Sequence, residues 1–322
     1  MGVFGFLLRQ FIARPAPIPE DVKLDGLTAL ITGATGGIGL EVARELVGHG
    51  VRRIILGVRD PQKGEEAKAE LTRMDCVVEV WTVDCEEWKS TVAFGQRAQA
   101  LDRLDIVILN AGVKKLKYSR AKTGHETNLQ VNYLSTALLS LMLFVPLRAT
   151  ARRTKKPGRL SIVSCEVHLT PFRERSATKV LSHMNHKDTF TPFSPERYYT
   201  TKLLNVLWGR ELSSRTDPKE VIVNVVNPGL CRTEIHRYEE SHSFRLFQRL
   251  FGWNPAIGGH CVADAAVVAD SDSHGAYISE MHVTEPSKFV SSTDGRATQS
   301  KLWLETMQLL RAEVPGAKLV AL

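Results

Sequence analysis

The chain has 322 residues, of which 43% are hydrophobic and 24% are charged. This composition is typical of a globular protein with a sizeable core, and it excludes a disordered chain. The formal net charge is +7, but lysine and arginine are spread along the sequence without the basic stripe expected of a nucleic-acid-binding protein. Five scattered cysteines without a CxxC pair indicate reduced thiols in an intracellular, cytoplasmic protein rather than disulfides or a metal site.

Residues 1–25 form an N-terminal tail that contains the apolar stretch Val3–Leu8. This stretch is too short to span a bilayer and lacks a small-residue cleavage site. Two interpretations stay open for it: a segment that lies in a membrane interface, or a tail that is docked or loose. The other long apolar run, Leu134–Leu147, has a length typical of a buried core helix.

From residue 26 onward, short apolar runs alternate with helical stretches. The runs that predict strands are 28–32, 53–58, 77–83, 105–110, 159–165 and 221–227, and the predicted helices between them are 37–49, 61–73, 86–101, one around the apolar run, and 197–215. Continuous apolar strands separated by helices indicate a parallel sheet that is covered on both faces. The sequence therefore predicts a doubly wound α/β sheet of the Rossmann type, as a single domain over residues 26–322.

A glycine-rich segment, Thr32–Gly39, stands between the first predicted strand and its helix. Glycine at 33, 37 and 39 permits a tight turn, close approach of a pyrophosphate, and packing of the helix against the strand. The N-terminus of the helix then offers unpaired N–H groups and the positive end of its dipole to the anion. The segment predicts a dinucleotide site, with Thr35 and Ile38 as further contacts.

The end of the second strand predicts which dinucleotide binds. An acidic residue there would bind the ribose hydroxyls, whereas an arginine would accommodate a 2′-phosphate. Val58 is followed by Arg59, and Lys63 would lie on the same helical face. These residues predict NADP(H), although Asp60 between them could favour NAD, and both cations could also belong to a solvated helix start.

Several later motifs complete an ordered set. They are Asp84 after the third strand, Asn110-Ala111-Gly112 after the fourth, Asn132, Tyr198 with Lys202 as YxxxK, and Pro228-Gly229 with Thr233. Together with TGxxxGxG, the set resembles the short-chain dehydrogenase/reductase family from residue 26 to about residue 280. One departure is Leu109, which replaces the first Asn of the family's NNAG motif.

The resemblance implies roles for these positions. Asp84 would contact the adenine, Asn132 would support a water relay, Lys202 would hold the nicotinamide ribose, and Pro228, Gly229 and Thr233 would lie near the nicotinamide. It also implies a homodimer or homotetramer. The segments GVRDPQKGEEA and HLTPF resemble retinol-dehydrogenase-like members and reductases of filamentous-fungal biosynthesis, which suggests secondary metabolism.

The spacing of Tyr198 and Lys202 suggests an acid–base pair. A phenol with an ordinary pKa of about 10 is a poor proton donor and acceptor near neutrality. An ammonium four residues later on the same helix would lower that pKa. We therefore expect Tyr198 to act as general acid in reduction and general base in oxidation, with Asn132 positioning water for proton exchange. The alternative is an ordinary pair on a helix surface.

The fifth strand departs from the family pattern, in which a serine binds the substrate carbonyl. Registering His168 on the retinol-dehydrogenase-like pattern puts Cys165 at that position, while Ser164 points to the opposite face because side chains alternate along a strand. A thiol is a weak donor. Three interpretations stay open: Cys165 substitutes for the serine, a local backbone change turns Ser164 inward, or catalysis has been lost.

Two stretches without clear periodicity, 168–196 and 234–254, follow strands beside the predicted site and are candidates for shaping a substrate pocket. Their many aromatic residues suggest a lipophilic substrate. The leading hypothesis is an NADP(H)-dependent oxidoreductase that interconverts a carbonyl and an alcohol. The alternative is a catalytically silent nucleotide-binding or scaffold protein. Peripheral membrane contact through Val3–Leu8 and Phe244–Trp253 is compatible with either.

Overall fold

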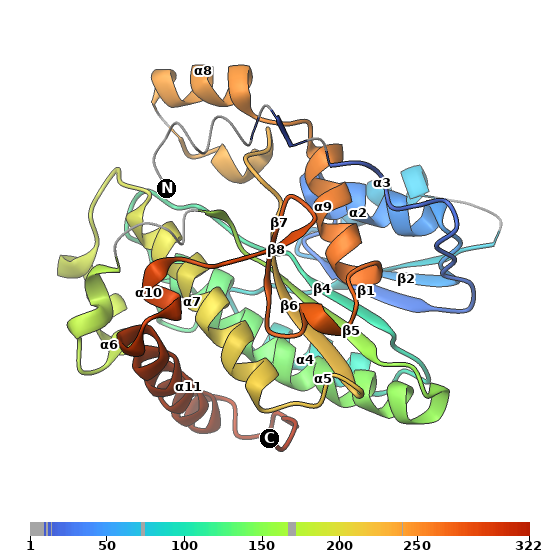
Figure 1. The fold of residues 1–322 in the computed structure, drawn as a ribbon. Coiled ribbons are helices and arrows are strands. Elements are labelled where there is room, and N and C mark those ends of the chain that lie inside the picture. The colour runs from blue at the N-terminus through green and yellow to red at the C-terminus, as the bar shows by residue number, and fades with distance from the viewer. Residues whose placement is uncertain (1–9, 11, 14, 72–74, 167–171, 240) are drawn as a thin grey trace.

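An eight-stranded sheet forms the centre of the fold in the computed structural model, which describes residues 10, 12–13, 15–71, 75–166, 172–239 and 241–322 (Figure 1). The strands are β1 (Thr28–Thr32), β2 (Arg53–Val58), β3 (Val77–Thr82), β4 (Ile106–Leu109), β5 (Gly158–Val163), β6 (Val221–Asn227), β7 (Tyr277–Ser279) and β8 (His282–Thr284). Their order is β3-β2-β1-β4-β5-β6-β7-β8. Neighbouring strands are parallel except for β7 and β8, which are antiparallel.

The sheet is sandwiched between two helical layers, as the apolar strands predict (Figure 1). One layer contains α2 (Gly37–Gly48), α3 (Pro61–Leu71) and α9 (Pro255–Val267), and the other contains α4 (Trp88–Gln99), α5 (Ser135–Thr154), α7 (Glu196–Ser214) and α11 (Thr293–Glu313). Within β1, Leu30 packs in the core of the second layer, while Ala29 and Ile31 pack in the core of the first. The alternation of side chains along each strand thus supplies two cores, and the predicted single Rossmann-type domain is confirmed.

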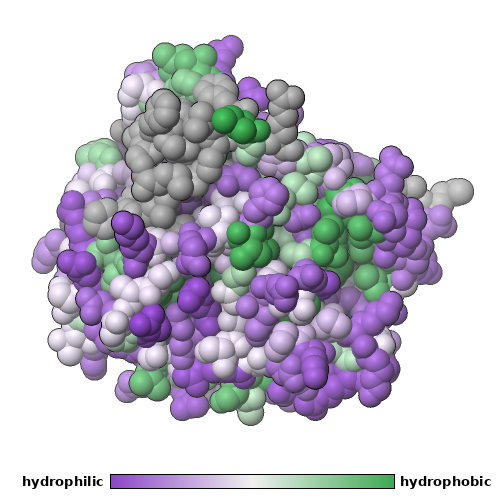
Figure 2. Space-filling model, in the orientation of Figure 1, coloured by the Kyte–Doolittle hydropathy of each residue, from purple (hydrophilic) through white to green (hydrophobic). Residues whose placement is uncertain are grey.

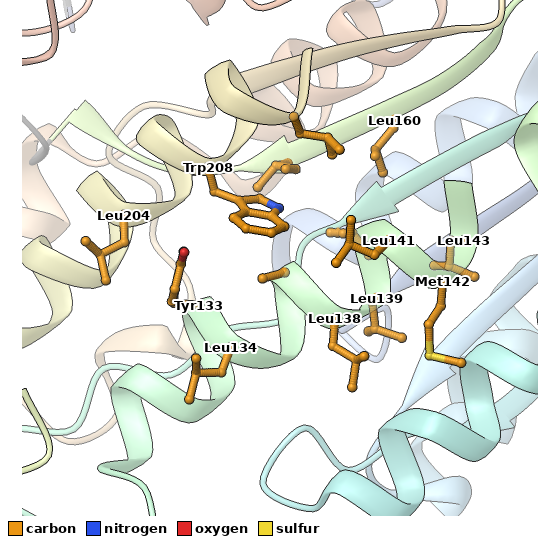
Figure 3. Packing of buried hydrophobic residues seen from close by; sticks show 14 of the residues in the cluster. Tyr133, Leu134, Leu138, Leu139, Leu141, Met142, Leu143, Leu160, Leu204 and Trp208 are labelled. Carbon is orange, nitrogen blue, oxygen red and sulfur yellow. The ribbon is translucent and has the colours of Figure 1, made fainter. Parts of the chain in front are cut away.

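The long apolar run lies inside the second core. The π-helical turn η1 (Leu129–Leu134) continues into α5, and the whole segment is long and apolar enough to cross a membrane, yet 83% of its most apolar window is buried in the protein. Its side chains pack in one cluster with Leu160 of β5 and Trp208 of α7 (Figure 3). The Trp208 indole donates a hydrogen bond to Ser140 Oγ at 2.9 Å, so even its polar atom is satisfied within the core. The prediction of a buried core helix is confirmed.

The predicted strand bounds are confirmed for β1, β2 and β6, and those of the other three differ by one or two residues. The expectation that 234–254 lacks regular structure is wrong, because it contains η5 (Glu234–His236) and α8 (His242–Phe251). The described part of 168–196 contains η3 (Arg173–Ser176), α6 (Val180–Met184) and η4 (Lys187–Thr189). The remaining short elements are η6 (Ser271–Ser273) and α10 (Lys288–Ser291). The predictions for Val3–Leu8 and His168 lie outside the described residues.

Candidate active site

The glycine turn after β1 is built as its sequence predicts. Gly33 has a φ of +70°, a conformation that L side chains rarely adopt. A Cβ added at Gly39 would lie 2.4 Å from the Gly33 carbonyl oxygen, so the start of α2 can pack this closely only without a side chain. No side chain of the described residues caps the N-terminus of α2, and a Cβ at Gly36 would meet no atom within 4 Å. The turn therefore leaves open space and unpaired N–H groups where a pyrophosphate would bind.

The strand order places this turn at a topological switch point. The chain runs from β1 to β2 and β3 on one side, whereas β4 and later strands lie on the other side. Crevices at such points are the usual dinucleotide sites of open α/β sheets. Asn110, directly after β4, links the two sides of the crevice by donating its side-chain amide to the Thr32 and Gly33 carbonyls at 3.0 and 3.1 Å. The Thr32 hydroxyl accepts the backbone N–H groups of Asn110 and Ala111, a role that the sequence analysis did not assign.

Asn132 lies in the π-helical turn η1 and is fully buried. Its Oδ1 accepts the Val113 N–H at 2.7 Å, and its Nδ2 donates to the Val113 carbonyl and to Thr201 Oγ1 at 2.9 and 3.0 Å. The side chain therefore fastens the loop after β4 to α7. Both of its N–H groups are committed, so it has none left to donate to a water molecule.

Tyr198 and Lys202 share one face of α7, as the four-residue spacing predicts. The Lys202 ammonium lies 5.8 Å from the centroid of the Tyr198 ring and donates to the Val163 carbonyl at the end of β5 at 2.9 Å. It also lies 3.7 Å from where a Cβ of Gly112 would be. Because Gly112 follows Asn110, which is bonded to the glycine turn, the pair belongs to the same site as the turn.

The electrostatics of the pair differ from the expectation. Burial, and next the thiol of Cys165, raise the pKa of Tyr198 well above its ordinary value. Burial also lowers the pKa of Lys202, although Cys165 opposes this effect. These directions run against the expectation that Lys202 makes the phenol acidic, because burial is the largest cause of both shifts. The phenol is therefore a weaker acid than an ordinary tyrosine.

The structure separates Ser164 from Cys165. The Ser164 hydroxyl is buried and donates to the Lys202 carbonyl at 2.8 Å, so it faces the backbone of α7. The Cys165 side chain is half-buried and hydrogen-bonds the phenol of Tyr198, and it also raises the pKa of Tyr199. The interpretation in which the backbone turns Ser164 inward does not match this geometry, and Cys165 occupies the place beside the acid.

The residues after β2 and β3 form a charged rim. Arg59 is exposed and lies 3.6 Å from Glu86, and Lys63 is also exposed. The Asp60 carboxylate accepts the backbone N–H groups of Gln62 and Lys63 at 3.0 and 3.3 Å, so it is engaged at the start of α3.

Asp84 lies on the same rim and pairs with Lys122 at 2.8 Å. This contact and the charge of Arg59 outweigh partial burial and lower the pKa of Asp84. The cationic and anionic groups that the sequence predicts near the adenosine end are therefore brought together.

The segment after β6 reaches the glycine turn. The Thr233 methyl lies 3.3 Å from where a Cβ of Gly37 would be, and Ile38 packs in a small cluster with Cys231 and Trp253. Gly229 has a φ of +75°, and a Cβ there would lie 2.5 Å from the Trp253 ring, so the Pro228-Gly229 turn is fixed against this cluster.

Two lysines after the Asn110–Gly112 motif hold the segment after β6 in place. Lys114, only 3% exposed, pairs with Glu239 at 2.9 Å, and Lys115 lies 3.9 Å above the Tyr238 ring. Burial, then Cys165 and then Glu239 raise the pKa of Tyr199, the residue that follows Tyr198 in the chain. These contacts could not be predicted from the sequence, because nothing in the local pattern pairs residues so far apart.

A cavity of about 510 Å³ lies beside Tyr199. It is lined by Tyr199 and Thr200 of α7 and by residues of 173–197, and it falls within the size range of ligand sites. The described part of the predicted loop 168–196 thus forms much of the wall of a cavity with mostly polar residues around it, which Tyr199 lines but Tyr198 does not.

Comparison with known proteins agrees with this geometry. Residues 27–177 match the family model for short chain dehydrogenases. The chain is 52% identical over 285 residues to the short chain dehydrogenase sol3 of Alternaria solani, covering 88% of this chain and 99% of that protein. It is 34% identical to the short chain dehydrogenase yanD of Aspergillus niger, covering 94% and 96% of the two chains.

Solved structures show the same fold. An uncharacterized protein of Mycobacterium paratuberculosis superposes with a TM-score of 0.67 at 22% identity, covering 90% of this chain and 96% of that one. The NADP complex of RhlG from Pseudomonas aeruginosa gives 0.61 at 19% identity, covering 81% and 97%. From the ordered motifs, the geometry of the site and these relatives, the chain belongs to the short-chain dehydrogenase/reductase family.

Proposed function

We propose that this oxidoreductase uses NADP(H) to interconvert a carbonyl and an alcohol on a lipophilic small molecule. The proposal rests on one observation: Tyr198, Lys202 and the Cys165 thiol lie together beside the loop after β4, which is hydrogen-bonded to the glycine turn. The glycine turn fits a dinucleotide because its helix N-terminus is uncapped and open. When bound, the nicotinamide supplies or accepts the hydride.

In the direction of reduction, the carbonyl oxygen gains negative charge and needs a proton. Tyr198 would donate that proton; burial raises the pKa of its phenol and makes it a weaker acid, so the transfer is driven by the charge that develops on the more basic alkoxide oxygen. The Cys165 thiol would donate a weaker hydrogen bond to the same oxygen and orient it toward the phenol. Lys202 is fixed by the Val163 carbonyl and would hold the nicotinamide ribose. Asn132 would serve the water relay by fixing Val113 and α7 rather than by donating to water.

The test is turnover of a panel of lipophilic ketones, aldehydes and alcohols by the full chain with NADPH or NADP⁺, alongside Tyr198→Phe. We expect the substitution to abolish turnover while NADPH binding, measured by calorimetry, stays within about twofold. Binding of NADPH without turnover of any substrate would instead support the catalytically silent alternative, and turnover that survives in Tyr198→Phe would remove the phenol from the mechanism.

The preference for NADP(H) rests on Arg59, which is exposed at the end of β2, and on Asp60, whose carboxylate is already engaged by α3. Arg59→Ala should weaken NADPH binding about tenfold or more, because a guanidinium bound to a phosphate contributes more than about 1.4 kcal/mol, whereas NADH should change little. Arg52→Ala, just before the opposite end of the same strand, is the matched control. Equal effects on both dinucleotides would contradict the preference.

The remaining expectations stay part of this proposal. The aromatic residues of 234–254 support a lipophilic substrate, and the fungal relatives support a role in secondary metabolism. A cytoplasmic location and a homodimer or homotetramer follow from the family. Light scattering on the purified chain would measure the number of subunits.

A further inference from the structure

Helix α8 presents an apolar stripe to solvent at the outer end of the molecule. Leu246 and Leu250, one turn apart, are 59% and 64% exposed, although large apolar side chains are usually covered. Arg245 and Arg249 stand beside them and are exposed as well. We call these four residues the α8 face. Figure 2 shows apolar surface at the end of the molecule where Figure 1 places α8.

The helix is held on the fold by contacts other than the α8 face. Gln248 donates its side-chain amide to the Cys231 carbonyl at 3.1 Å. Phe244 lies against Lys114, whose ammonium is 4.4 Å from the centroid of the ring. Ser241 caps the N-terminus of the helix by accepting the Phe244 N–H. The helix is therefore amphipathic: its inner face packs on the fold, and the leucines of its outer face are exposed to solvent.

The N-terminal tail is fastened at the same end of the molecule. The Trp253 indole, two residues after α8, donates to the Gln10 carbonyl at 2.8 Å, and the Gln10 side chain donates to the Leu230 carbonyl at 2.9 Å. Ala13 packs on the cluster that contains Trp253, and Ile12 is 66% exposed. Gln10 and Ala13 therefore lie beside the C-terminal end of α8.

The charges on the α8 face indicate which binding partner fits it. In a two-fold pair of chains the same patch would face itself, so Arg245 and Arg249 would meet the same arginines of the second copy. An anionic lipid surface offers phosphates to the arginines and acyl chains to the leucines, which is the usual way an amphipathic helix lies in a membrane interface. The net charge of +7 has the matching sign.

We propose that the α8 face docks the protein on an anionic membrane surface. The helix belongs to the segment that Lys114 and Lys115 hold against the loop after the Asn110–Gly112 motif. Docking there would bring the site within reach of molecules dissolved in the bilayer. This inference goes beyond the proposed reaction and does not depend on it.

The experiment is sedimentation of the full chain with phosphatidylcholine vesicles, with and without about 30% phosphatidylserine, at low and high salt. We expect binding to the anionic vesicles that weakens as salt rises. The double substitution Leu246→Ser and Leu250→Ser should weaken binding at least about tenfold, because two apolar side chains lose their burial. The double substitution Arg245→Gln and Arg249→Gln should weaken it about fivefold for each charge on anionic vesicles, and much less on neutral ones.

Leu304→Ser is the matched control, because Leu304 is 67% exposed on α11, in the opposite helical layer. Far-ultraviolet circular dichroism and melting temperature check that each variant folds. The proposal is overturned if the unmodified chain does not bind anionic vesicles, or if Leu304→Ser weakens binding as much as the α8 variant. It is also overturned if the α8 substitutions dissociate a dimer without changing vesicle binding. Because sedimentation needs neither cofactor nor substrate, its result is separate from the test of the oxidoreductase activity.

Discussion

Replacing Cys165 by serine tests how the site binds the reacting oxygen. The Tyr198 phenol hydrogen-bonds the Cys165 sulfur, so a substrate oxygen bound by the phenol would lie beside the thiol, which could donate to it. A hydroxyl is a stronger donor than a thiol, and it is smaller, so Cys165→Ser introduces no clash. Loss of one donor to a developing oxyanion costs about 10²–10³ in rate, and a thiol retains part of that effect.

We therefore expect Cys165→Ser to raise kcat about tenfold, equivalent to about 1.4 kcal/mol of extra stabilisation of the transition state, with little change in KM. The pH profile gives a second readout. Cys165 raises the pKa of Tyr198, so its removal should shift the alkaline loss of reductase activity to lower pH. Both quantities come from steady-state oxidation of NADPH at several pH values with one accepted carbonyl substrate.

Ser164→Ala is the companion variant. It removes the buried hydrogen bond to the Lys202 carbonyl and should lower the free energy of unfolding by about 1–3 kcal/mol. An unchanged kcat in Cys165→Ser, combined with loss of turnover in a still-folded Ser164→Ala, would show that the serine binds the substrate and that this reasoning is wrong.

Two further predictions concern the frame of the site. Gly39→Ala should weaken NADPH binding at least about tenfold and destabilise the fold by about 1–3 kcal/mol, because its Cβ would lie 2.4 Å from the Gly33 oxygen. Gly48→Ala in the same helix meets no atom within 4 Å and should leave both quantities nearly unchanged; calorimetry and thermal melts compare the two, and equal behaviour would contradict the packing argument. Burial raises the pKa of Asp264 from 3.8 to about 6. The Asp264 carboxyl therefore binds its proton more tightly in the folded state than in the unfolded chain. Its contribution to the free energy of unfolding is fully present below about pH 4 and is lost as the pH rises through 6. Asp264→Asn should flatten this pH dependence and be about 2–3 kcal/mol more stable at pH 7 in urea titrations, and a destabilised variant at pH 7 would refute the sign.

The sequence predicted the parts of the fold whose signal is local. Buried strands such as Thr28–Thr32 are continuous apolar runs, and the glycine turn needs its residues at fixed spacing, so both could be identified directly. Helix α8 was missed because it is only ten residues long and begins within a polar loop. The pairing of Lys114 with Glu239 could not be predicted, because it joins residues that only the folded chain brings together.

The electrostatics of the site were harder to predict than its geometry. Alternation along the strand does not describe Ser164 and Cys165, because both follow the end of β5 and both contact α7. Spacing alone correctly placed Tyr198 and Lys202 on one face of α7. It could not show that both side chains are deeply buried, and burial decides the direction of both pKa shifts. The pKa of a side chain depends on how much water the finished fold excludes, and that is a property of the packing of distant segments.

The hydrogen bonds of Asn132 restrict which amino acids position 132 can hold. Thr201 gives its only hydroxyl proton to the Tyr198 carbonyl, so toward position 132 it can act only as an acceptor, and the Val113 carbonyl is an acceptor as well. The side chain there must supply two protons and one lone pair. An amide does so, whereas Asn132→Asp, although nearly identical in shape, would set a carboxylate against two oxygens. Replacing the one buried Nδ2 nitrogen by an oxygen would thus break the connection between the loop after β4 and the catalytic helix.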